Sequence, residues 1–342
     1  VMQRLFPAPV VTKTRSAPPM PEHPESASMP VIATGAEGKP QKTPPIQSVS
    51  VLSGNTFVVS GRDGDIDAQP TDTQGLFSWD TRFLSRWLLT INGLAPRPLS
   101  TDDLQYYAVQ FFGVPETGTI YVDAKLSVIR TREVGKGFQD TITILNHANQ
   151  GIDLDVRIDA GADFADAFEV KDQLPKRGEY YSRVESNRLV LGYRRDDFHR
   201  ETWIETDIPA TIDEQSLRYH IHIEPHSQWT TTLRVITAQV GMGGTITQVH
   251  SSKQAMQEDL ANWLARAPKL SCEWKPMSQI YHRSLVDLAA LRFFPRMIPG
   301  EALPAAGLPW FMTIFGRDSI LTSLQALPFV PEMAETTLRA LA

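Results

Sequence analysis

Hydrophobic and polar residues alternate along much of the chain between about residues 47 and 240. In the segment 152–159, the hydrophobic positions alternate with charged ones: Ile152, Leu154, Val156 and Ile158 with Asp153, Asp155, Arg157 and Asp159. A period of two predicts a strand with one buried face and one solvated face. Similar patterns predict strands over residues 49–52, 56–59, 119–128, 139–145, 188–193, 219–223 and 230–236.

Turn signals separate these predicted strands. Asn92-Gly93 and the run from Gly135 to Gly137 suit tight hairpin turns, and Ser60 to Gly64 forms a further turn signal. Many strands with little helix are typical of two packed antiparallel sheets. We therefore predict a β-sandwich domain, similar to a supersandwich, over residues 47–240.

The periodicity changes to that of helices after residue 240. The run Gly241–Gly244 is interpreted as a hinge, and residues 241–274 as a linker with a connecting helix over 251–266. Further helices are predicted over 277–294, 319–327 and 331–342, so that residues 275–342 begin an incomplete all-helical domain. So few helices cannot bury a core by themselves, and they need the β domain, a partner or further helices.

Residues 1–46 are rich in Pro, Ser, Thr and Lys, and we expect a disordered leader there. The chain begins with Val1 instead of Met, which suggests a fragment of a longer protein. We find no apolar run long enough for a signal peptide or a membrane span.

Composition narrows the possible partners. The 342 residues are 42% hydrophobic and 21% charged, with a formal net charge of −6, which argues against binding to nucleic acid or anionic membranes. A single cysteine, Cys272, excludes an internal disulfide framework and a cysteine-based zinc site. These features fit a cytoplasmic protein. His220 and His222 share one strand face, but zinc needs a third ligand, so we expect no metal and no cofactor.

The richest chemical signal lies in residues 305–319. An aromatic loop leads to Arg317 and Asp318 at the predicted start of a helix, and its large side chains are Trp310, Phe311 and Phe315. In the structural interpretation Asp318 caps the helix and Arg317 is solvated. In the functional one the aromatic rings stack on a sugar while the charged pair orients its hydroxyls. A solvated aromatic loop is costly unless something covers it, which favours the second.

The helical segment 275–342 resembles the first helices of the (α/α)₆-barrel glycosidases of the glycogen-debranching (amylo-α-1,6-glucosidase) type. The residues that carry this resemblance are the runs Ala306 to Phe311 and Phe315 to Ser319. It implies that Arg317 and Asp318 hold the terminal sugar, with Trp310 and Phe311 as neighbours in the pocket. The β region is similar to the N-terminal domain of bacterial enzymes of this kind, in the runs Gly75 to Ser85 and Asp163 to Glu169.

Three residues of these β segments are candidate rim contacts of the sugar site, namely Asp80, Arg82 and Asp166. The structural alternatives are an ion pair within the β domain for the Asp80–Arg82 stretch and a solvated acidic loop for 163–169. The family pattern has Val-Arg where this chain has Ser78 and Trp79.

The resemblance implies a glycoside hydrolase acting on α-glucan or related oligosaccharides. An inverting enzyme of this class needs two carboxyl groups about 6.5–9.5 Å apart. The resemblance places both on loops beyond residue 342, so the catalytic residues stay unknown and the chain alone is expected to be inactive. The alternative, in which Asp318 itself acts as the acid, stays open. Two rivals stay open: a carbohydrate-binding β-sandwich module without catalysis, and an interaction scaffold whose helices dock to a partner.

Overall fold

The computed structural model describes residues 48–69, 73–102, 105–115, 125–135, 137–172, 174, 176–241, 244–248 and 251–342. All of them lie within one compact unit, Pro45–Ala342. The predicted disordered leader lies outside the described residues, as does most of the strand predicted over 119–128.

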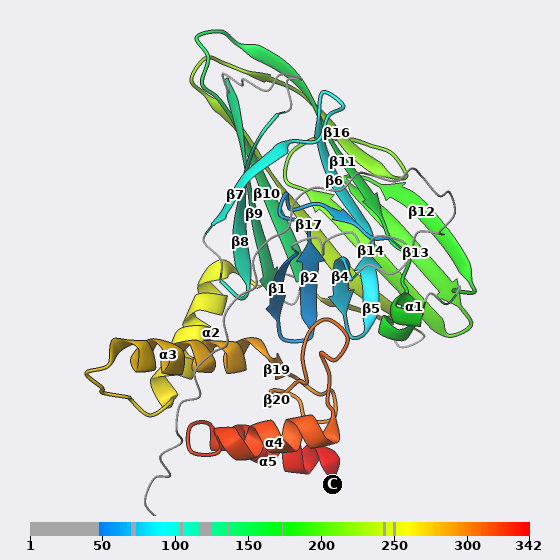
Figure 1. Cartoon of the computed structure of the whole chain (residues 1–342). Helices are drawn as coiled ribbons and strands as arrows, with labels where there is room; N and C mark the ends of the chain where they lie inside the picture. The colour runs from blue at the N-terminus through cyan, green and yellow to red at the C-terminus, as the bar shows by residue number, and fades with distance from the viewer. Residues whose placement is uncertain are drawn as a thin grey trace, which may run out of the picture. The chain divides into compact units, whose positions relative to one another are not determined.

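The larger sheets are antiparallel throughout (Figure 1). The nine-stranded sheet has the order β12 (Glu179–Glu185), β13 (Arg188–Arg195), β14 (Phe198–Thr206), β17 (Gln228–Gly241), β10 (Gly137–Asn146), β9 (Leu126–Gly135), β8 (Ala108–Val114), β7 (Arg97–Asp102), with β18 (Gly244–Gln248) paired to β17. The five-stranded sheet has the order β15 (Thr211–Ile212), β16 (Ser216–Ile223), β11 (Ile152–Gly161), β6 (Arg86–Ile91), β3 (Ile66–Asp67).

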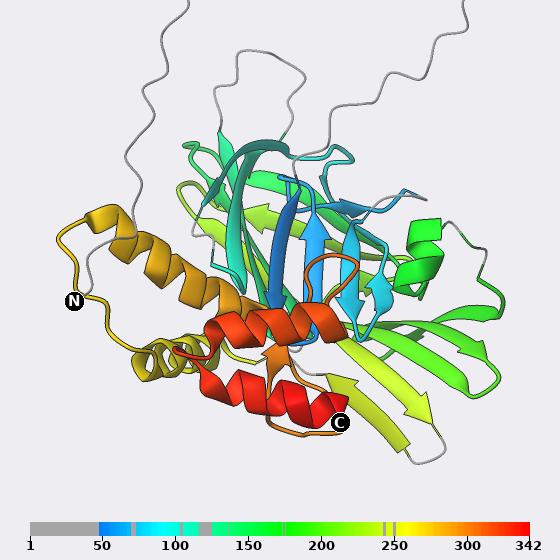
Figure 2. The same cartoon turned by 60° about the horizontal axis from the view of Figure 1, so that its bottom comes forward.

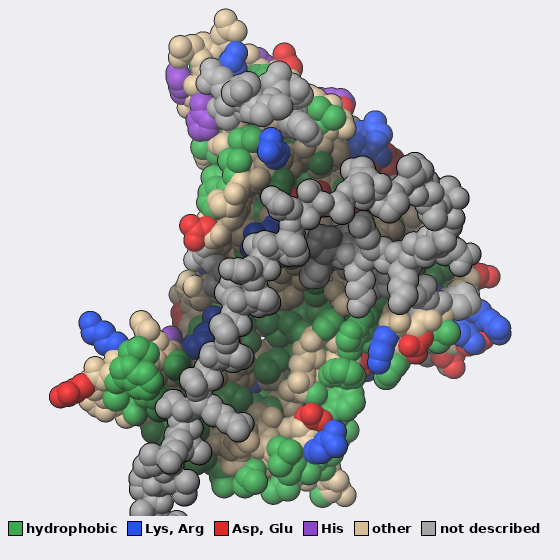
Figure 3. All heavy atoms as spheres, viewed as in Figure 1, with side chains coloured by type: hydrophobic (Ala, Val, Ile, Leu, Met, Phe, Trp, Pro, Cys, Tyr) green, Lys and Arg blue, Asp and Glu red, His purple; other side chains and the backbone are tan. Residues whose placement is uncertain are grey.

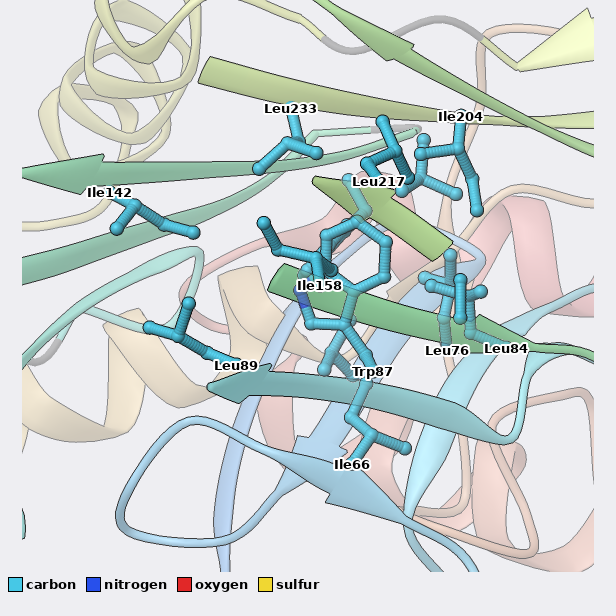
Figure 4. Packing of buried hydrophobic residues seen from close by; sticks show 14 of the residues in the cluster. Ile66, Leu76, Leu84, Trp87, Leu89, Ile142, Ile158, Ile204, Leu217 and Leu233 are labelled. Carbon is cyan, nitrogen blue, oxygen red and sulfur yellow. The ribbon is translucent and has the colours of Figure 1, made fainter. Parts of the chain in front are cut away.

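A four-stranded sheet lies against them, in the order β1 (Val49–Ser53), β2 (Thr56–Ser60), β4 (Gly75–Ser78), β5 (Thr81–Leu84). Side chains from all three sheets meet in one hydrophobic core, as Trp87, Ile142 and Leu76 illustrate (Figure 4). The predicted β-sandwich-like arrangement is therefore confirmed. Its strands form because alternate residues enter this core: in β11 burial alternates along Leu154, Val156 and Ile158.

One predicted turn and the predicted hinge can be compared directly with the structure. Asn92 (φ 52°) and Gly93 (φ 81°) adopt the left-handed conformation that a tight hairpin turn requires, and Ile91 pairs with Leu94 across them. The glycine run that was interpreted as a hinge instead joins two paired strands, because Gly241 of β17 lies opposite Gly244 of β18.

The helices are α1 (Ala167–Asp172), α2 (Lys253–Arg266), α3 (Lys275–Ala290), α4 (Gly316–Ala326) and α5 (Pro331–Leu341). A short ribbon, β19 (Arg292–Phe293) and β20 (Leu303–Pro304), connects α3 to the segment before α4. Helices α4 and α5 lie side by side next to this ribbon (Figure 2). In the part of the chain that the structure describes, no helix is both long enough and apolar enough to cross a membrane.

A second hydrophobic cluster joins the four-stranded sheet to the segments around β19 and β20. It contains Phe57 and Phe77 from the sheet, and Phe293, Leu303 and Met312 from the C-terminal part. Asn55 strengthens the same junction, because its side chain donates to the carbonyl of Phe294 at 2.8 Å and accepts from the amide of Phe294 at 2.9 Å. These contacts fix the loop before α4 against the β domain.

Candidate functional site

The hairpin turn between β4 and β5 carries the first candidate residue, Asp80. Trp79 (φ 49°) and Asp80 (φ 63°) both occupy the left-handed region, which costs energy for residues other than glycine. Contacts of Trp79 hold this turn in place. Its ring packs edge-on against Phe293 with centroids 5.9 Å apart, and the guanidinium of Arg296 lies 4.4 Å from its centroid.

The segment from Asp163 to α1 lies beside this turn. The Asp166 carboxylate accepts from the amides of Phe168 at 2.9 Å and Glu169 at 2.8 Å, while Glu169 accepts from the amide of Asp166 at 2.8 Å. This reciprocal arrangement is a capping box. The amide of Ala167 donates to the carbonyl of Asp80 at 3.0 Å, so α1 is fixed directly to the hairpin turn.

Arg82 is buried, with 4% of its surface exposed, and forms an ion pair with Asp163. Its Nε lies 3.0 and 3.1 Å from the two carboxylate oxygens, and Nη1 donates to the carbonyl of Gln74 at 3.2 Å. The ion pair expected within the β domain therefore forms, but with Asp163 and not with Asp80. The pair ties β5 to the segment that leads into α1.

Asp80 remains accessible to solvent at the surface of this junction. Partial burial by the surrounding protein, and then the nearby negative charge of Asp166, raise the pKa of its carboxyl group. Of the three predicted rim residues, the structure thus leaves Asp80 accessible, uses Asp166 as a helix cap and buries Arg82.

The loop before α4 forms a tight turn. The amide and carbonyl of Gly307 pair with those of Phe311 at 3.0 and 2.9 Å, and the Leu308–Pro309 peptide between them is cis. Trp310 is half-buried against the second hydrophobic cluster, whereas Phe311 is 39% exposed. The ring of Phe311 meets that of Phe315 edge-on at 5.0 Å, so the turn presents two aromatic rings side by side.

Arg317 and Asp318 lie in the first turn of α4, and both side chains are exposed. The residue that precedes the helix is Phe315, and no side chain caps this end. Asp318 therefore does not cap the helix as the structural interpretation required, whereas Arg317 is solvated as that interpretation expected. Neither side chain makes a hydrogen bond or an ion pair with any residue of the described part of the chain. The following residue is different: Ser319 is buried and its hydroxyl donates to the carbonyl of Pro304 at 2.8 Å.

The structure brings the two β segments and the aromatic loop together. Lys171 of α1 lies over the ring of Phe311, with Nζ 5.9 Å from its centroid. Ala165 and Val170 share the second hydrophobic cluster with Trp310. The segment that contains α1 and the aromatic loop are therefore neighbours in space, although more than 130 residues separate them along the chain.

A cleft that the sequence analysis did not anticipate lies elsewhere, between β11 and the pair β12–β13. It has a volume of about 760 Å³, and its lining includes Arg157, Asp159, Tyr180 and Gln215. A sequence signal for it is the adjacent pair Tyr180-Tyr181, which lies on a strand at the edge of the sheet and contributes both residues to the lining.

Comparisons with known proteins bear on this arrangement. Residues 51–234, more than half of the chain, match a family described as the N-terminal domain of some glycogen debranching enzymes. None of the curated proteins that were compared matches the chain.

Among solved structures, the chain is similar to a protein from the human microbiome described as a kojibiose phosphorylase, with a TM-score of 0.37 and 11% identity. That match covers 70% of this chain but only 34% of the other, so the chain spans about a third of its length. It is also similar to a galactose mutarotase related enzyme from Lactobacillus acidophilus, with a TM-score of 0.38, 8% identity and coverage of 60% of this chain and 100% of the other. A third similar structure, from Escherichia coli K12, is described as an aldose 1-epimerase, with a TM-score of 0.32, 6% identity and coverage of 56% and 98%.

Proposed function

Because the chain belongs to the family of N-terminal domains found in some glycogen debranching enzymes, we propose that it is part of a glycoside hydrolase acting on α-glucans or related oligosaccharides. The family match over residues 51–234 is the observation that carries this proposal. In this proposal, the β domain supports a sugar site built on the loop before α4 and on the first turn of that helix.

In the proposed site, Arg317 and Asp318 bind the terminal sugar and the aromatic loop forms its wall. Both charged side chains are exposed in the described structure, and they have no partner there that a ligand would need to displace. An unpaired guanidinium can donate two parallel hydrogen bonds to adjacent hydroxyls, and a carboxylate can accept from two. The rings of Phe311 and Phe315 offer apolar surface beside them, with Trp310 behind.

We further propose that α3, α4 and α5 begin a helical toroid. Large hydrophobic side chains on these helices are exposed, with Leu324 at 63%, Leu338 at 64% and Ile280 at 59%. Hydrophobic side chains gather over the region of α4 and α5 (Figure 3). Apolar patches of this kind are normally covered in a complete protein, and additional helices would cover them.

Hydrolysis in this proposal follows the inverting route, with one carboxylic acid protonating the leaving oxygen and one carboxylate activating a water. Both groups belong to parts of the catalytic domain beyond residue 342, and Asp318 is the candidate within the chain for a more direct acid role. The 342-residue chain should therefore bind a sugar without hydrolysing it. Robust turnover of α-1,6- or α-1,4-linked glucosides by the chain alone would refute this placement of the acid and base.

A titration with the disaccharide isomaltose tests the sugar site itself. We expect binding by the chain and at least about tenfold weaker binding by Asp318→Asn and by Arg317→Ala, since each loses charge-assisted hydrogen bonds of about 1.5–3 kcal/mol. Glu335→Gln and Arg97→Ala are matched controls, because both residues are exposed and lie on other elements. Equal isomaltose affinity in all five proteins would contradict the proposed site.

The alternative function is a carbohydrate-binding β-sandwich module without catalysis. The cleft between β11 and β12–β13 favours this alternative, because it lies wholly within the β domain. Isomaltose binding that survives deletion of residues 270–342 with unchanged affinity would support the module and would leave the loop before α4 without a role in isomaltose binding.

A further inference from the structure

The cleft between β11 and β12–β13 has the size and the lining of a ligand site. Its volume of about 760 Å³ falls within the range of roughly 300–1,000 Å³ that is typical of small-molecule sites. One wall is formed by Arg157 and Asp159–Gly161 at the end of β11 and by Ala162 after it. The opposite wall is formed by Tyr180 to Ser182 of β12 with Leu191 of β13. The turn between β15 and β16 contributes Glu214 and Gln215.

Tyr180 gives the cleft a fixed aromatic surface. Its side chain is 50% exposed, its ring packs edge-on against Tyr193 with centroids 5.1 Å apart, and its hydroxyl donates to the carbonyl of Asp163 at 3.1 Å. A ring that is held at both ends and open on one side offers a flat apolar platform, on which the CH groups of a sugar can stack.

Polar side chains on the β11 wall are held in place by each other but keep hydrogen-bonding capacity for a ligand. Arg157 contacts Asp159 through Nε at 2.7 Å and Nη2 at 2.6 Å, and both contacts go to the same carboxylate oxygen, Oδ1. The second oxygen of Asp159 therefore remains able to accept a hydrogen bond from a ligand. Both side chains lie in the lining of the cleft.

The turn that carries Gln215 is also preorganised. The Asp213 carboxylate accepts from the amide of Gln215 at 2.9 Å and from the hydroxyl of Ser216 at 2.7 Å. The carbonyl of Gln215 accepts from the amide of Ala160 at 2.9 Å, which fixes the turn to β11. The Gln215 side chain is exposed and can both donate to and accept from hydroxyl groups.

Charge balance indicates the class of ligand. The titratable side chains of the lining that carry charge at neutral pH are Arg86 and Arg157 on one hand, and Asp159 and Glu214 on the other. With two positive and two negative groups, the cleft does not favour an anion or a cation. An uncharged, hydroxyl-rich ligand suits the alternation of aromatic surface, planar guanidinium, carboxylate and amide.

From these observations we infer that this cleft is a second glycan-binding site, which holds a short segment of an uncharged oligosaccharide apart from the site on α4. The identity of that oligosaccharide as an α-glucan rests on the proposed function. No residue from the helical part contributes to the lining, but the segment around Asp163 connects the two places. Phe164 lines the cleft, and Lys171, further along the same segment, lies over Phe311 of the aromatic loop.

Titration of the 342-residue chain with maltoheptaose, followed by calorimetry, tests the inference. Tyr180→Ala should weaken binding about tenfold, since an aromatic contact contributes about 0.5–1.5 kcal/mol beyond its buried area. Gln215→Ala should weaken it about fivefold through the loss of one or two hydrogen bonds, without touching the backbone contacts that hold the turn. Circular dichroism confirms that each variant is folded.

Matched variants make the outcome specific. Tyr180→Phe keeps the ring and should bind like the wild type, as should Gln228→Ala, which removes an exposed glutamine at the start of β17. The double variant Arg317→Ala/Asp318→Asn removes the proposed sugar site on α4, so the maltoheptaose binding that remains in it should come from the cleft and should still be weakened when Tyr180→Ala is added. If that double variant abolishes binding while the cleft variants do not, the cleft inference is overturned and the proposed function stands.

Two other outcomes also decide the matter. A wild-type chain that binds no maltoheptaose overturns the cleft inference, whereas the proposed sugar site is judged separately by its response to isomaltose. Maltoheptaose binding that is weakened by Tyr180→Ala and Gln215→Ala but not by Tyr180→Phe or Gln228→Ala supports the cleft, whatever the result with isomaltose.

Discussion

Replacing Asp140 by Asn should destabilise the β domain strongly, because Asp140 is the acceptor at the centre of a buried ionic cluster. The side chain is fully buried and one of its oxygens accepts from Trp87 Nε1 at 2.9 Å, Arg130 Nη2 at 2.8 Å and Arg132 Nη2 at 3.0 Å. The isosteric amide keeps the shape of the side chain but removes the negative charge that balances two buried guanidinium groups.

The substitution Asp140→Asn affects the two arginines differently, because they do not have the same remaining partners. Arg130 keeps a second acidic partner, Asp65. Among the residues that the structure describes, Arg132 keeps the carbonyl of Gly64 and the rings of Phe111 and Phe138, whose centroids lie 5.3 and 4.9 Å away, but no second carboxylate. Breaking a buried ion pair by removing one partner costs about 3–5 kcal/mol. We expect a loss within this range, which is a large share of a typical unfolding free energy of about 5–15 kcal/mol.

The assay is urea unfolding at neutral pH, with Asp153→Asn as the control. Asp153 is an exposed carboxylate whose ion-pair partner in the described part of the chain is His222, so its loss should cost less than about 1 kcal/mol. The double variant Asp140→Asn/Arg132→Met removes the uncompensated charge as well, so it should be more stable than Asp140→Asn alone. A loss below about 1 kcal/mol for Asp140→Asn, or a double variant that shows the sum of both single losses, would refute the reasoning.

The same cluster predicts a pH dependence. Burial by itself raises the pKa of Asp140, but the positive charges of Arg130 and Arg132 outweigh it, and the pKa lies below its usual value of 3.8. The stabilising contribution is therefore present above about pH 4, the pKa of an unfolded aspartate, and is lost as the pH falls through the lowered folded value. Asp140→Asn should remove this part of the acid sensitivity, measured as the unfolding free energy between neutral and acidic pH.

Three further predictions concern single side chains. Asp166→Ala removes the cap of α1 and should lower the unfolding free energy by about 1 kcal/mol in urea titrations, and an unchanged midpoint would speak against the capping role. Burial, followed by the hydrogen bond to Glu201, raises the pKa of Tyr181 to about 12. The contribution of the Tyr181 hydroxyl to stability is therefore complete below about pH 10 and is lost as the pH rises through about 12. Tyrosinate absorbance and thermal unfolding, each compared with Tyr181→Phe, check this. Ser319→Ala leaves the carbonyl of Pro304 without its buried donor and should lower the unfolding free energy by about 1–3 kcal/mol in urea titrations. An unchanged unfolding free energy would show that this hydrogen bond does not stabilise the protein.

Local patterns in the sequence predict much of the fold. The alternation at Ile152 to Ile158 corresponds to β11, and the helix predicted over 251–266 corresponds to α2, which starts after the capping residue Ser252. Helix α4 begins at Gly316, three residues before the predicted start at Ser319. The residue before the helix is the aromatic Phe315, which is not one of the polar residues by which a helix start is recognised in a sequence. Boundaries of this kind depend on tertiary contacts that local propensity does not contain.

Pairings between distant segments were beyond the sequence analysis. The alternation along β9 and β10 places Arg130, Arg132 and Asp140 at inward positions, which signals a buried ionic cluster, but their partners Asp65 and Trp87 come from other strands. Likewise, the predicted ion pair of Arg82 forms with a residue 81 positions away. Such contacts depend on the order of strands in the sheets, and hairpin signals alone do not determine that order.

The candidate site was predicted in its residues but not in its arrangement. Arg317, Asp318 and the aromatic loop were recognised from residue types and a family resemblance, and their roles as sugar ligands stay predictions. That α1 lies next to the aromatic loop required the structure, because Lys171 meets Phe311 only after the four-stranded sheet has packed against the C-terminal segments.

The most direct test of the proposed sugar site is a crystal structure of the 342-residue chain soaked with isomaltose. The account predicts a terminal glucosyl ring beside Phe311 and Phe315, with adjacent hydroxyls within hydrogen-bond distance of both Arg317 and Asp318. Isomaltose bound elsewhere, with these two side chains left in contact with solvent alone, would contradict it.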